Sequence, residues 1–394
     1  MKREYVLVVN CGSSSIKFQI IHPHYGQTVC KGIVENLATA RCTLRWNGET
    51  KQLNSSNDCS VFEELFSAIQ PWEKELIAVG HRVVHGGEQI FSATMIDDQI
   101  IKVIETCSAF APLHNPLNLK GICKFQQHFP QLPQVAVFDT AFHHSLPPHA
   151  YLYGIPYVYY QRYQIRRYGF HGMSHRYVTQ KASAVLNTPI ETLGLISVHL
   201  GNGCSVSAVL GGKSVDTSMG MTPLEGLMMG QRSGDVDPGA LAYLMEKERL
   251  TPEEIHHILN CESGLLGVSG LNKDMRIIEQ EIDKGNQRAK IAFDLFCYRA
   301  AKSIASYFVP LPKVHGIIFT GGIGENSCRV RGSIIRWLQG CHLLLDEERN
   351  TNHGLGSCYL ISPENYSPSV LVIPTNEELN IAEETIKIIE REVK

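Results

Sequence analysis

The middle of the chain contains the step Gly201-Asn202-Gly203 between two apolar, partly alternating segments that together span residues 195–209. Asn-Gly between strand-like segments is the strongest short-range signal for a β-hairpin, because a type I′ turn needs positive φ at both central residues. The glycines also leave backbone N–H groups uncovered, and successive N–H groups in a turn form a concavity that binds phosphate. We therefore expect a tight hairpin here, although an Asn-Gly hairpin taken alone is more often purely structural.

The N-terminal region repeats this plan. Residues 5–21 contain an apolar strand, a small polar turn with Gly12 and a second strand. Self-similarity of this kind predicts two halves with related folds, each offering a phosphate-facing hairpin. A third glycine turn, at residues 321–326, follows the apolar strand 317–320, and three such turns indicate a nucleotide.

Composition narrows the class of protein. A chain of 394 residues is too long for one compact core, so two domains are expected. The net charge of −3 offers no basic stripe for nucleic acid, and no apolar run is long enough to cross a membrane.

The sequence also carries signals of the cell compartment. Asn10 and Gly12 interrupt the first apolar run, which argues against a cleaved signal. The 12 cysteines lack a CxxC pair and the 17 histidines lack an HExxH motif, which favours reduced thiols in the cytoplasm over a metal site.

The rest of the chain alternates strands with helices, which predicts an α/β protein. Further strands and a hairpin tip at 46–49 are expected in residues 28–56, and a last strand at 370–374. Helices are expected at residues 60–69, 97–108, 175–186, 240–258 and 286–308, from 272 onward, and from 377 to the end. Residues 146–163 show little periodicity and are expected to cross between the halves, and residues 216–239 to form structured loops.

Two chemistry-bearing residues lie close to predicted strands. Asp139 follows the strand 134–138, and functional groups in open α/β sheets gather beyond the carboxyl ends of strands. A helix N-cap explains Asp139 equally well on local grounds. Arg82 lies in the glycine-flanked segment 80–87, where a surface ion pair is the alternative role.

Other nucleotide motifs are missing. Residues 211–214 read Gly-Gly-Lys-Ser, but Ser207 stands where the first glycine of a Walker A loop belongs. No GxGxxG follows a strand, and the protein kinase signatures are absent. These absences argue against the P-loop, dinucleotide-binding and protein kinase classes.

Six ordered segments give the chain a family resemblance. They are residues 9–17, 80–87, 138–143, 167–172, 199–203 and 322–326. With these motifs the chain resembles the acetate kinase family, of the acetate and sugar kinase, Hsc70 and actin superfamily, over nearly its whole length. The resemblance implies an α/β fold of two duplicated ribonuclease H-like domains with an active-site cleft between them. It implies an N-terminal actin-like ATPase domain at 1–145 plus 376–394, closed by the C-terminal helix, and a second at 146–375 with most nucleotide contacts.

The resemblance also implies an activity. This is reversible, Mg²⁺-dependent transfer of the γ-phosphoryl group of ATP to acetate, giving acetyl phosphate and ADP, with weaker use of propionate. Mn²⁺ can substitute for Mg²⁺. The expected partners are acetate and ATP, without nucleic acid or membrane, and the expected state is a cytoplasmic homodimer.

The resemblance assigns roles to individual residues. The catalytic residues are Asp139, His171 and Arg232. The substrate is bound by Arg82 and by an apolar pocket of Val84, Leu113, Phe170 and Pro223. Mg²⁺ is held by Asn10 and Glu377, with Glu378 as the alternative acid. The nucleotide contacts are Lys17, His199, Leu200, Gly201, Asn202, Gly203, Asp274, Met275, Arg276, Gly322, Ile323, Gly324, Glu325 and Asn326.

Physical chemistry agrees with these roles. Phosphoryl transfer depends on positioning and on stabilising charge, so Arg82 can bind the carboxylate while His171 and Arg232 meet the moving phosphoryl group. His171 serves as a neutral donor or as a cation. A carboxylate acceptor is already ionised at neutral pH, so Asp139 is expected to act through magnesium, water or an arginine rather than as a base. Val84 leaves little room for an ethyl group.

Two alternatives stay open. One is another kinase of the same fold, either a propionate kinase or a sugar kinase. In the sugar kinase, Asp139 would serve as the base that removes the proton of the acceptor hydroxyl. The other is a non-catalytic nucleotide switch of the actin-like class, since a fold alone does not define a function.

Overall fold

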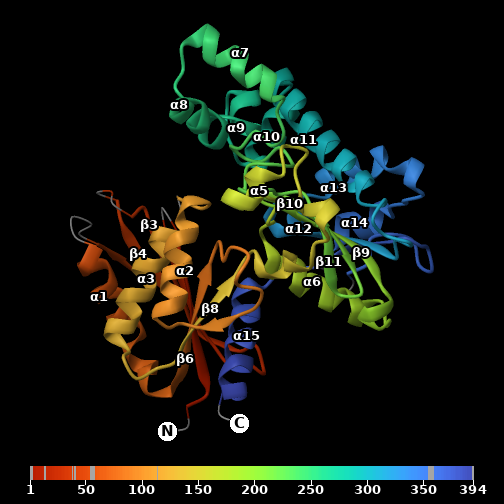
Figure 1. Cartoon of the computed structure of the whole chain (residues 1–394). Coiled ribbons are helices and arrows are strands. Elements are labelled where there is room, and N and C mark those ends of the chain that lie inside the picture. Colours follow the sequence, from red (N-terminus) through yellow and green to blue (C-terminus); the bar gives the residue numbers. More distant parts are fainter. Residues whose placement is uncertain are drawn as a thin grey trace. The chain divides into compact units, whose positions relative to one another are not determined.

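The computed structural model describes residues 3–12, 15–37, 39, 41–53, 58–112, 114–353 and 359–392. The chain divides into two compact units (Figure 1). Unit 1 comprises Met1–Phe142 and Asn376–Lys394, and unit 2 comprises His143–Thr375. Unit 1 is therefore built from two segments that are distant in the sequence.

Unit 1 contains one mixed sheet and its covering helices. Its strands are β1 (Tyr5–Cys11), β2 (Ser15–Ile21), β3 (Thr28–Glu35), β4 (Thr43–Trp46), β5 (Glu49–Gln52), β6 (Leu76–Val83), β7 (Thr94–Met95) and β8 (Gln134–Phe138). Its helices are α1 (Asp58–Ile69), α2 (Asp98–Thr106), α3 (Asn115–His128) and α15 (Glu377–Glu392), with short 3₁₀ segments η1 (Gln70–Glu75) and η2 (Cys107–Ala109). The strand order is β5-β4-β3-β2-β1-β6-β8-β7, with β1, β6 and β8 parallel and β1, β2 and β3 antiparallel.

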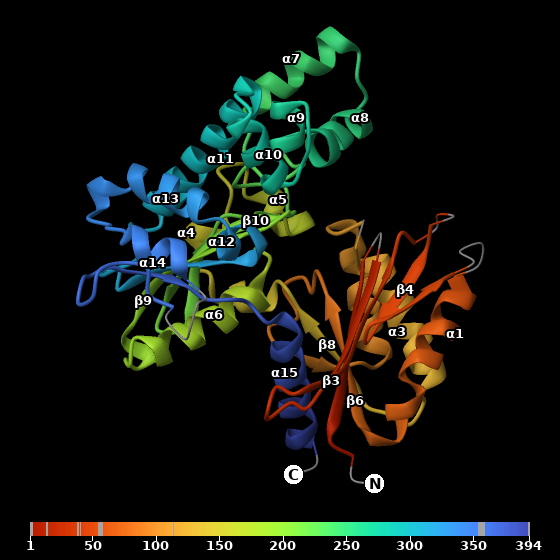
Figure 2. The same ribbon diagram turned by 180° about the vertical axis from the view of Figure 1, so that it is seen from behind.

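Helix α15 packs on one face of this sheet, and α1 and α3 lie on the other (Figure 2). A Cβ added to Gly80 in β6 would lie 2.5 Å from Oγ1 of Thr385 and 2.8 Å from Cγ2 of Ile381 in α15. Glycine is thus required because the helix lies against the strand. Successive strand side chains point to opposite faces, so Arg82 shares the α15 face with Gly80.

Unit 2 contains the second sheet and the remaining helices. Its strands are β9 (Gly194–Leu200), β10 (Cys204–Leu210), β11 (Lys213–Thr217), β12 (Gly316–Thr320) and β13 (Ser369–Val372). Its α-helices are α4 (Pro148–Tyr151), α5 (Val158–Tyr163), α6 (Gly172–Val185), α7 (Pro238–Glu248), α8 (Pro252–His257), α9 (Gly264–Ser269), α10 (Met275–Asp283), α11 (Gln287–Ser306), α12 (Gly321–Asn326), α13 (Cys328–Trp337) and α14 (Glu347–Asn352). Short 3₁₀ segments are η3 (Ala141–Ser145), which spans the boundary, η4 (Ile190–Thr192) and η6 (Gln339–Cys341), and η5 (Ile258–Glu262) is a π-helical turn.

The two sheets share one plan. The order in unit 2 is β11-β10-β9-β12-β13, with β9, β10 and β11 antiparallel and β9, β12 and β13 parallel. Strands β3-β2-β1-β6-β8 of unit 1 have the same order and directions. The expected duplication is therefore confirmed. In unit 2, α6 packs over β9 and β12, where Val178 and Ala182 join Leu195 and Ile318 in an apolar cluster.

Several local expectations need correction. The hairpin at 195–209 is present, since Cys204 pairs with Leu200, but residues 201–203 have no positive φ and the turn is not type I′. The expected third glycine turn is the helix α12, entered through Gly321 at φ +77°.

Other segments are more regular than expected. Residues 146–163 contain α4 and α5, and residues 216–217 extend β11. Pro116 occupies the first turn of α3, where its missing N–H costs nothing.

Candidate active site

Arg82 and Asp139 meet at the carboxyl ends of two neighbouring parallel strands in unit 1. Arg82 pairs with Val137 in the register of β6 and β8, so Asp139 comes just beyond the end of β8. Asp139 accepts hydrogen bonds from Arg82 Nε at 3.2 Å and Nη2 at 2.6 Å. Burial alone would lower the pKa of Arg82, but Asp139 and Glu377 outweigh it and raise that pKa. This fork fixes the orientation of the guanidinium. Both carboxylate oxygens of Asp139 bond Arg82, so the structure favours this role over the helix cap considered from the sequence.

Glu377 adds a second carboxylate to this cluster. Its Oε2 lies 3.9 Å from Nε of Arg82, at the first residue of α15. Burial raises the pKa of Glu377, Arg82 opposes that rise, and the negative charges of Asp139 and Glu378 add to it. Three acids therefore surround one arginine, and a cation would relieve their repulsion.

The donor atoms near this cluster suit magnesium. Asn10, at the end of β1, pairs in register with Lys17, so both lie on the α15 face. An amide oxygen from Asn10 and a carboxylate from Glu377 are the hard oxygen ligands that Mg²⁺ prefers, and Mg²⁺ commonly takes only one or two protein ligands beside water and phosphate. In the described part of the chain, no three His, Cys, Asp or Glu side chains gather into a metal cage. The residues present therefore fit a magnesium ion shared with phosphate.

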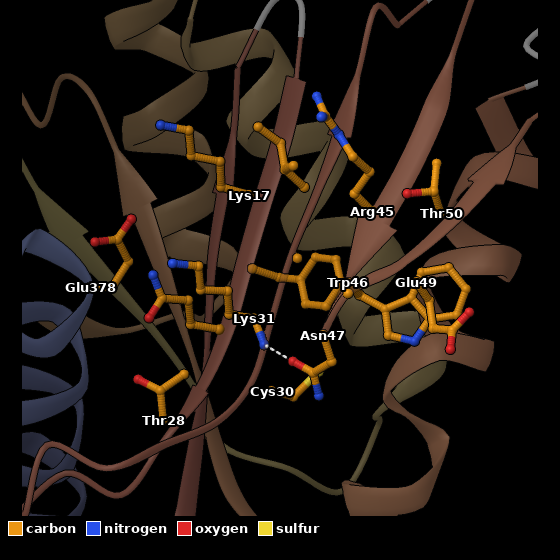
Figure 3. Close-up of a pocket in the computed structure, with 15 residues that line it drawn as sticks. Lys17, Thr28, Cys30, Lys31, Arg45, Trp46, Asn47, Glu49, Thr50 and Glu378 are labelled. Carbon is orange, nitrogen blue, oxygen red and sulfur yellow. Dashed lines mark hydrogen bonds between the residues drawn. The ribbon is translucent and has the colours of Figure 1, made fainter.

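Lys17 also lines a separate hollow over β2, β3 and β4, of about 760 Å³ (Figure 3). The labelled side chains include Lys31, Arg45 and, from the start of α15, Glu378. Glu378 thus faces the hollow with Lys17, whereas Glu377 faces Arg82. This difference favours Glu377 over Glu378 as the acid nearest the fork.

The four expected apolar pocket residues are distributed over both units. Val84 follows β6 in unit 1 and is buried, and Leu113 lies outside the described residues. Phe170 and Pro223 belong to unit 2, where Phe170 is buried and its carbonyl oxygen faces Nε2 of His143 at 3.0 Å. The structure therefore describes three of the four residues, one in unit 1 and two in unit 2, and their common pocket stays a prediction.

In unit 2 the β9–β10 hairpin approaches His171 and Arg232. A Cβ on Gly203 would lie 3.2 Å from Cε1 and Nε2 of His171 and 3.8 Å from Nη1 of Arg232. The same Nη1 donates to the carbonyl oxygen of Pro223 at 3.3 Å. A side chain at 203 would crowd the His171 ring, so this close approach, rather than a positive φ, favours glycine here. Three residues expected at the site, His171, Arg232 and Pro223, are thus brought together.

His171 itself has an unusual backbone. It precedes α6 with φ 56° and ψ 24°, the left-handed region that few residues other than glycine adopt. Its ring stacks on His199 with centroids 4.3 Å apart. Strained backbone of this kind clusters at functional sites.

Arg167 ties the loop after β11 into place. Its Nη1 donates to the carbonyl oxygens of Thr217 and Ser218 at 2.9 Å, and its Nη2 donates to Glu225 at 2.6 Å. Tyr153 also donates to the Glu225 carboxylate. This loop carries Pro223 and leads to Arg232, so Arg167 and Glu225 support the site without having been predicted for it.

A pocket of about 640 Å³ lies beside the same hairpin in unit 2. Eight residues expected to bind nucleotide line it: Gly201, Asn202, Asp274, Met275, Arg276, Gly322, Ile323 and Asn326. The lining also includes Lys273, Glu279 and Ser327, which were not predicted from the sequence. Their places in the sequence could have revealed them. Lys273 and Ser327 adjoin predicted residues, and Glu279 lies one helical turn beyond Met275.

The other expected nucleotide residues lie elsewhere. Lys17 belongs to unit 1, and His199, Leu200, Gly203 and Gly324 do not line the pocket. Glu325 points away from it: one carboxylate oxygen accepts from the N–H groups of Gly321 at 2.9 Å and Thr375 at 3.0 Å. Glu325 therefore supports the turn into α12 rather than lining the pocket.

The duplicated sheet, the pocket and the cationic residues define a nucleotide-binding α/β protein with groups suited to phosphoryl chemistry. The acetokinase family matches residues 5–383. An acetate kinase of Thermoanaerobacterium thermosaccharolyticum is 46% identical over 397 residues, covering 98% of this chain and 99% of the relative. An acetate kinase of Shewanella sp. (strain ANA-3) is 47% identical over 399 residues, covering 99% and 100%. This chain therefore belongs to the acetokinase family.

Solved structures agree with this assignment. A propionate kinase from Francisella tularensis subsp. tularensis SCHU S4 superimposes with a TM-score of 0.93 at 43% identity, covering 98% of this chain and 100% of that one. Porphyromonas gingivalis acetate kinase gives a TM-score of 0.92 at 40% identity, with the same coverage. The expected fold class, two duplicated ribonuclease H-like domains, is confirmed. No helix in the described ranges is long and apolar enough to cross a membrane.

Proposed function

We propose that this chain is an enzyme that transfers the γ-phosphoryl group of ATP reversibly to acetate, giving acetyl phosphate and ADP. Membership of the acetokinase family over residues 5–383 supports the reaction class. The single observation that supports a carboxylate acceptor is the Arg82 fork. Asp139 occupies the Nε–Nη2 edge of the guanidinium, which leaves the Nη1–Nη2 edge for a second carboxylate in the same bidentate manner.

In this proposal Asp139 is a positioning residue. It holds Arg82 in one orientation, and it has no proton to remove because acetate is already ionised at neutral pH. Val84 is buried directly after β6, and we assign it to the acceptor pocket, where its branched side chain would leave room for a small alkyl group. The acceptor is therefore a short carboxylate.

His171 and Arg232 act on the transferring phosphoryl group. Both approach Gly203 in the hairpin loop, beside the pocket that we assign to ATP or ADP. Charge spreads over the equatorial oxygens in the transition state, and preorganised N–H donors stabilise it there. Burial lowers the pKa of Arg232. Arginine stays protonated at neutral pH even so, which suits this role.

Asn10 and Glu377 would hold Mg²⁺, or Mn²⁺ in its place. The ion would neutralise phosphate charge, and its two positive charges would balance the acids around Arg82. Lys17 on the same face would contribute a further cation to the phosphates.

The direct test is to trap acyl phosphate with hydroxylamine, using purified protein, ATP and Mg²⁺. Acetate should react most strongly, propionate less, and butyrate and sugars not at all. A stronger signal with propionate would establish the alternative, propionate kinase, which the likeness to the Francisella structure favours. ATP turnover that ignores every acceptor would contradict the proposal and indicate an actin-like nucleotide switch.

Two further proposals concern the setting of the enzyme. We propose a homodimer, as the family resemblance implies, and the exposed helix α7, where Tyr243 is 63% exposed, is a candidate surface for it. We place it in the cytoplasm, where its acetyl phosphate would supply acetyl-CoA synthesis. Cysteines without a disulfide, such as Cys11 and Cys204, are compatible with that reducing location.

A further inference from the structure

Behind His171 lies a buried row of neutral polar side chains. Nδ1 of His171 lies 2.9 Å from Oγ of Ser205, and that Oγ lies 2.7 Å from Nε2 of His175. Nδ1 of His175 lies 2.8 Å from Oγ of Ser197. Ser197, Ser205 and His175 are fully buried, on β9, β10 and α6 respectively. The four side chains form one hydrogen-bonded chain that ends at Ser197.

His175 is neutral within this chain. Burial holds its pKa well below the ordinary value, and His143 and His199 lower it further. A neutral imidazole has one N–H and one lone pair, so it donates on one side and accepts on the other. Each serine hydroxyl has a single proton. If Ser205 accepted from both histidines, its own buried proton would lack an acceptor, because its hydroxyl bonds no other described group. The chain can therefore run in only two directions.

Ser197 decides between the two directions. In the first, Ser197 donates to Nδ1 of His175, Nε2–H of His175 donates to Ser205, and Ser205 donates to Nδ1 of His171. In the second, every bond is reversed and the Ser197 proton needs another acceptor. Within the described ranges, the Ser197 hydroxyl has no partner other than His175. A buried hydroxyl proton without an acceptor is unfavourable, so the first direction is the stable one.

We propose that Ser197, His175 and Ser205 hold His171 as a neutral imidazole with its proton on Nε2. This inference rests on the proposed function, in which His171 donates to the transferring phosphoryl group. The Nε2 edge is the one that faces Gly203, 3.2 Å from the position of a Cβ there. A fixed Nε2–H is thus aimed at the hairpin loop before substrate arrives, which is the preorganisation that stabilises developing charge.

The same chain disfavours a cationic His171. A doubly protonated ring would have to donate from Nδ1 to Ser205, which reverses the chain and strands the Ser197 proton. Groups around the ring that can carry charge include His175 of α6, His199 of β9 and Arg232 of the loop. All three are basic, so none of them favours a further positive charge on His171.

The tautomer can be measured without substrate. Full-length protein labelled with ¹⁵N-histidine is examined by NMR at pH 7, and the His171 signals are assigned from their loss in His171→Gln. We expect a proton on Nε2 and a bare Nδ1. A proton on Nδ1, or on both nitrogens, would overturn the proposal regardless of the kinetics of any variant.

Kinetics of two matched variants test the role of the chain. Ser205→Ala removes the hydroxyl that contacts His171, and Ser207→Ala removes a buried hydroxyl from the same strand that bonds Ser214 and the carbonyl of Asp216 instead. We expect kcat to fall about 10–100-fold in Ser205→Ala, the loss typical of residues that orient a functional histidine, with both KM values unchanged. Ser207→Ala should leave kcat close to the wild-type value, because Ser207 bonds neither His171 nor His175.

The outcomes separate this proposal from the proposed function. Absence of acyl phosphate in the wild-type protein would contradict the function, while the NMR result would still decide the tautomer. An active enzyme whose Ser205→Ala variant matches Ser207→Ala in kcat would overturn the role of the chain in catalysis. Mixed tautomers of His171 in Ser205→Ala, together with slower turnover, would support it.

Discussion

The two units build similar sheets but place opposite kinds of polar group on them. In unit 1, the face under α15 gathers the charges of Arg82, Asp139 and Glu377. In unit 2, the face under α6 gathers the neutral Ser205 and His175. The charged groups lie on β6, just beyond β8 and at the start of α15, whereas the neutral groups lie on β10 and α6. The two units therefore place their polar groups on different strands of one shared plan. The charged residues of unit 1 lie where the carboxylate and the metal are proposed to bind. The neutral hydroxyl and imidazole groups of unit 2 lie behind His171, which is proposed to contact the phosphoryl group.

The largest effect should come from removing the cation of unit 2. Arg232→Ala is expected to lower kcat about 10³–10⁵-fold, as loss of a transition-state arginine does in other phosphoryl transfers. Steady-state rates of acyl phosphate formation measure this. Arg232→Lys, which keeps the charge but not the planar fork, should recover only part of the rate. Full activity of Arg232→Ala would mean that unit 2 works through neutral donors alone.

Acid should destabilise both units through their buried neutral histidines. Burial lowers the pKa of His81 to about 4, of His85 to about 3 and of His143 to about 4. The unfolded chain binds these protons near pH 6.5, so stability is present above that pH and is lost as the pH falls toward 4. From pH 7 to 5 the free energy of unfolding should fall by about 2 kcal/mol for each histidine.

Urea unfolding at the two pH values measures this loss. His85→Asn should reduce the loss in unit 1 and His143→Asn that in unit 2. His24→Asn is the control, because the His24 side chain is 60% exposed. If the free energy of unfolding fell equally between the two pH values in all three variants, burial of neutral histidines would not be the cause of the acid sensitivity.

Asp139→Asn tests whether unit 1 works by charge or by geometry. The amide still accepts one hydrogen bond from Arg82 but loses the bidentate, charge-assisted fork. We expect turnover to fall about 10–100-fold, as is usual for residues that orient a functional group, and Mg²⁺ affinity to weaken. Rates and magnesium titrations measure these effects. Unchanged Mg²⁺ affinity with a rate loss that follows substrate protonation would instead make Asp139 a base.

The smallest expected effect concerns the apolar part of unit 1. Val84→Ala should improve propionate relative to acetate by about tenfold, at the lower end of the roughly 10–200-fold (1–3 kcal/mol) that one methylene is worth in an apolar pocket. The ratio of kcat/KM values for the two acids measures it. An unchanged ratio would remove Val84 from the acceptor pocket.

Sequence patterns predicted the duplication well, because alternation and glycine turns are local signals. The family resemblance, rather than any pattern, assigned the residues around Asp274 and Gly322 to the nucleotide. The structure brings them into one pocket, and their binding of a nucleotide stays a prediction. Sequence patterns could not predict that Glu325 turns toward Thr375, since that contact joins residues 50 positions apart.

The buried polar row was missed for another reason. Ser197, His199, Ser205 and Ser207 alternate with apolar residues, a pattern that ordinarily indicates a solvent-facing side of a strand. Only the packing of α6 reveals that this side is covered. Leu113, expected in the acceptor pocket, lies outside the described residues and stays a prediction.

The division of unit 1 into two sequence segments has a consequence for biosynthesis. All residues that line the nucleotide pocket lie between Gly201 and Ser327, so they leave the ribosome before α15. Glu377 and the helix that covers Gly80 follow unit 2 in the sequence and are synthesised after it. The segment that carries the pocket is therefore complete while unit 1 still lacks its proposed metal carboxylate. The order of translation thus makes the proposed metal site wait until all of unit 2 has been made.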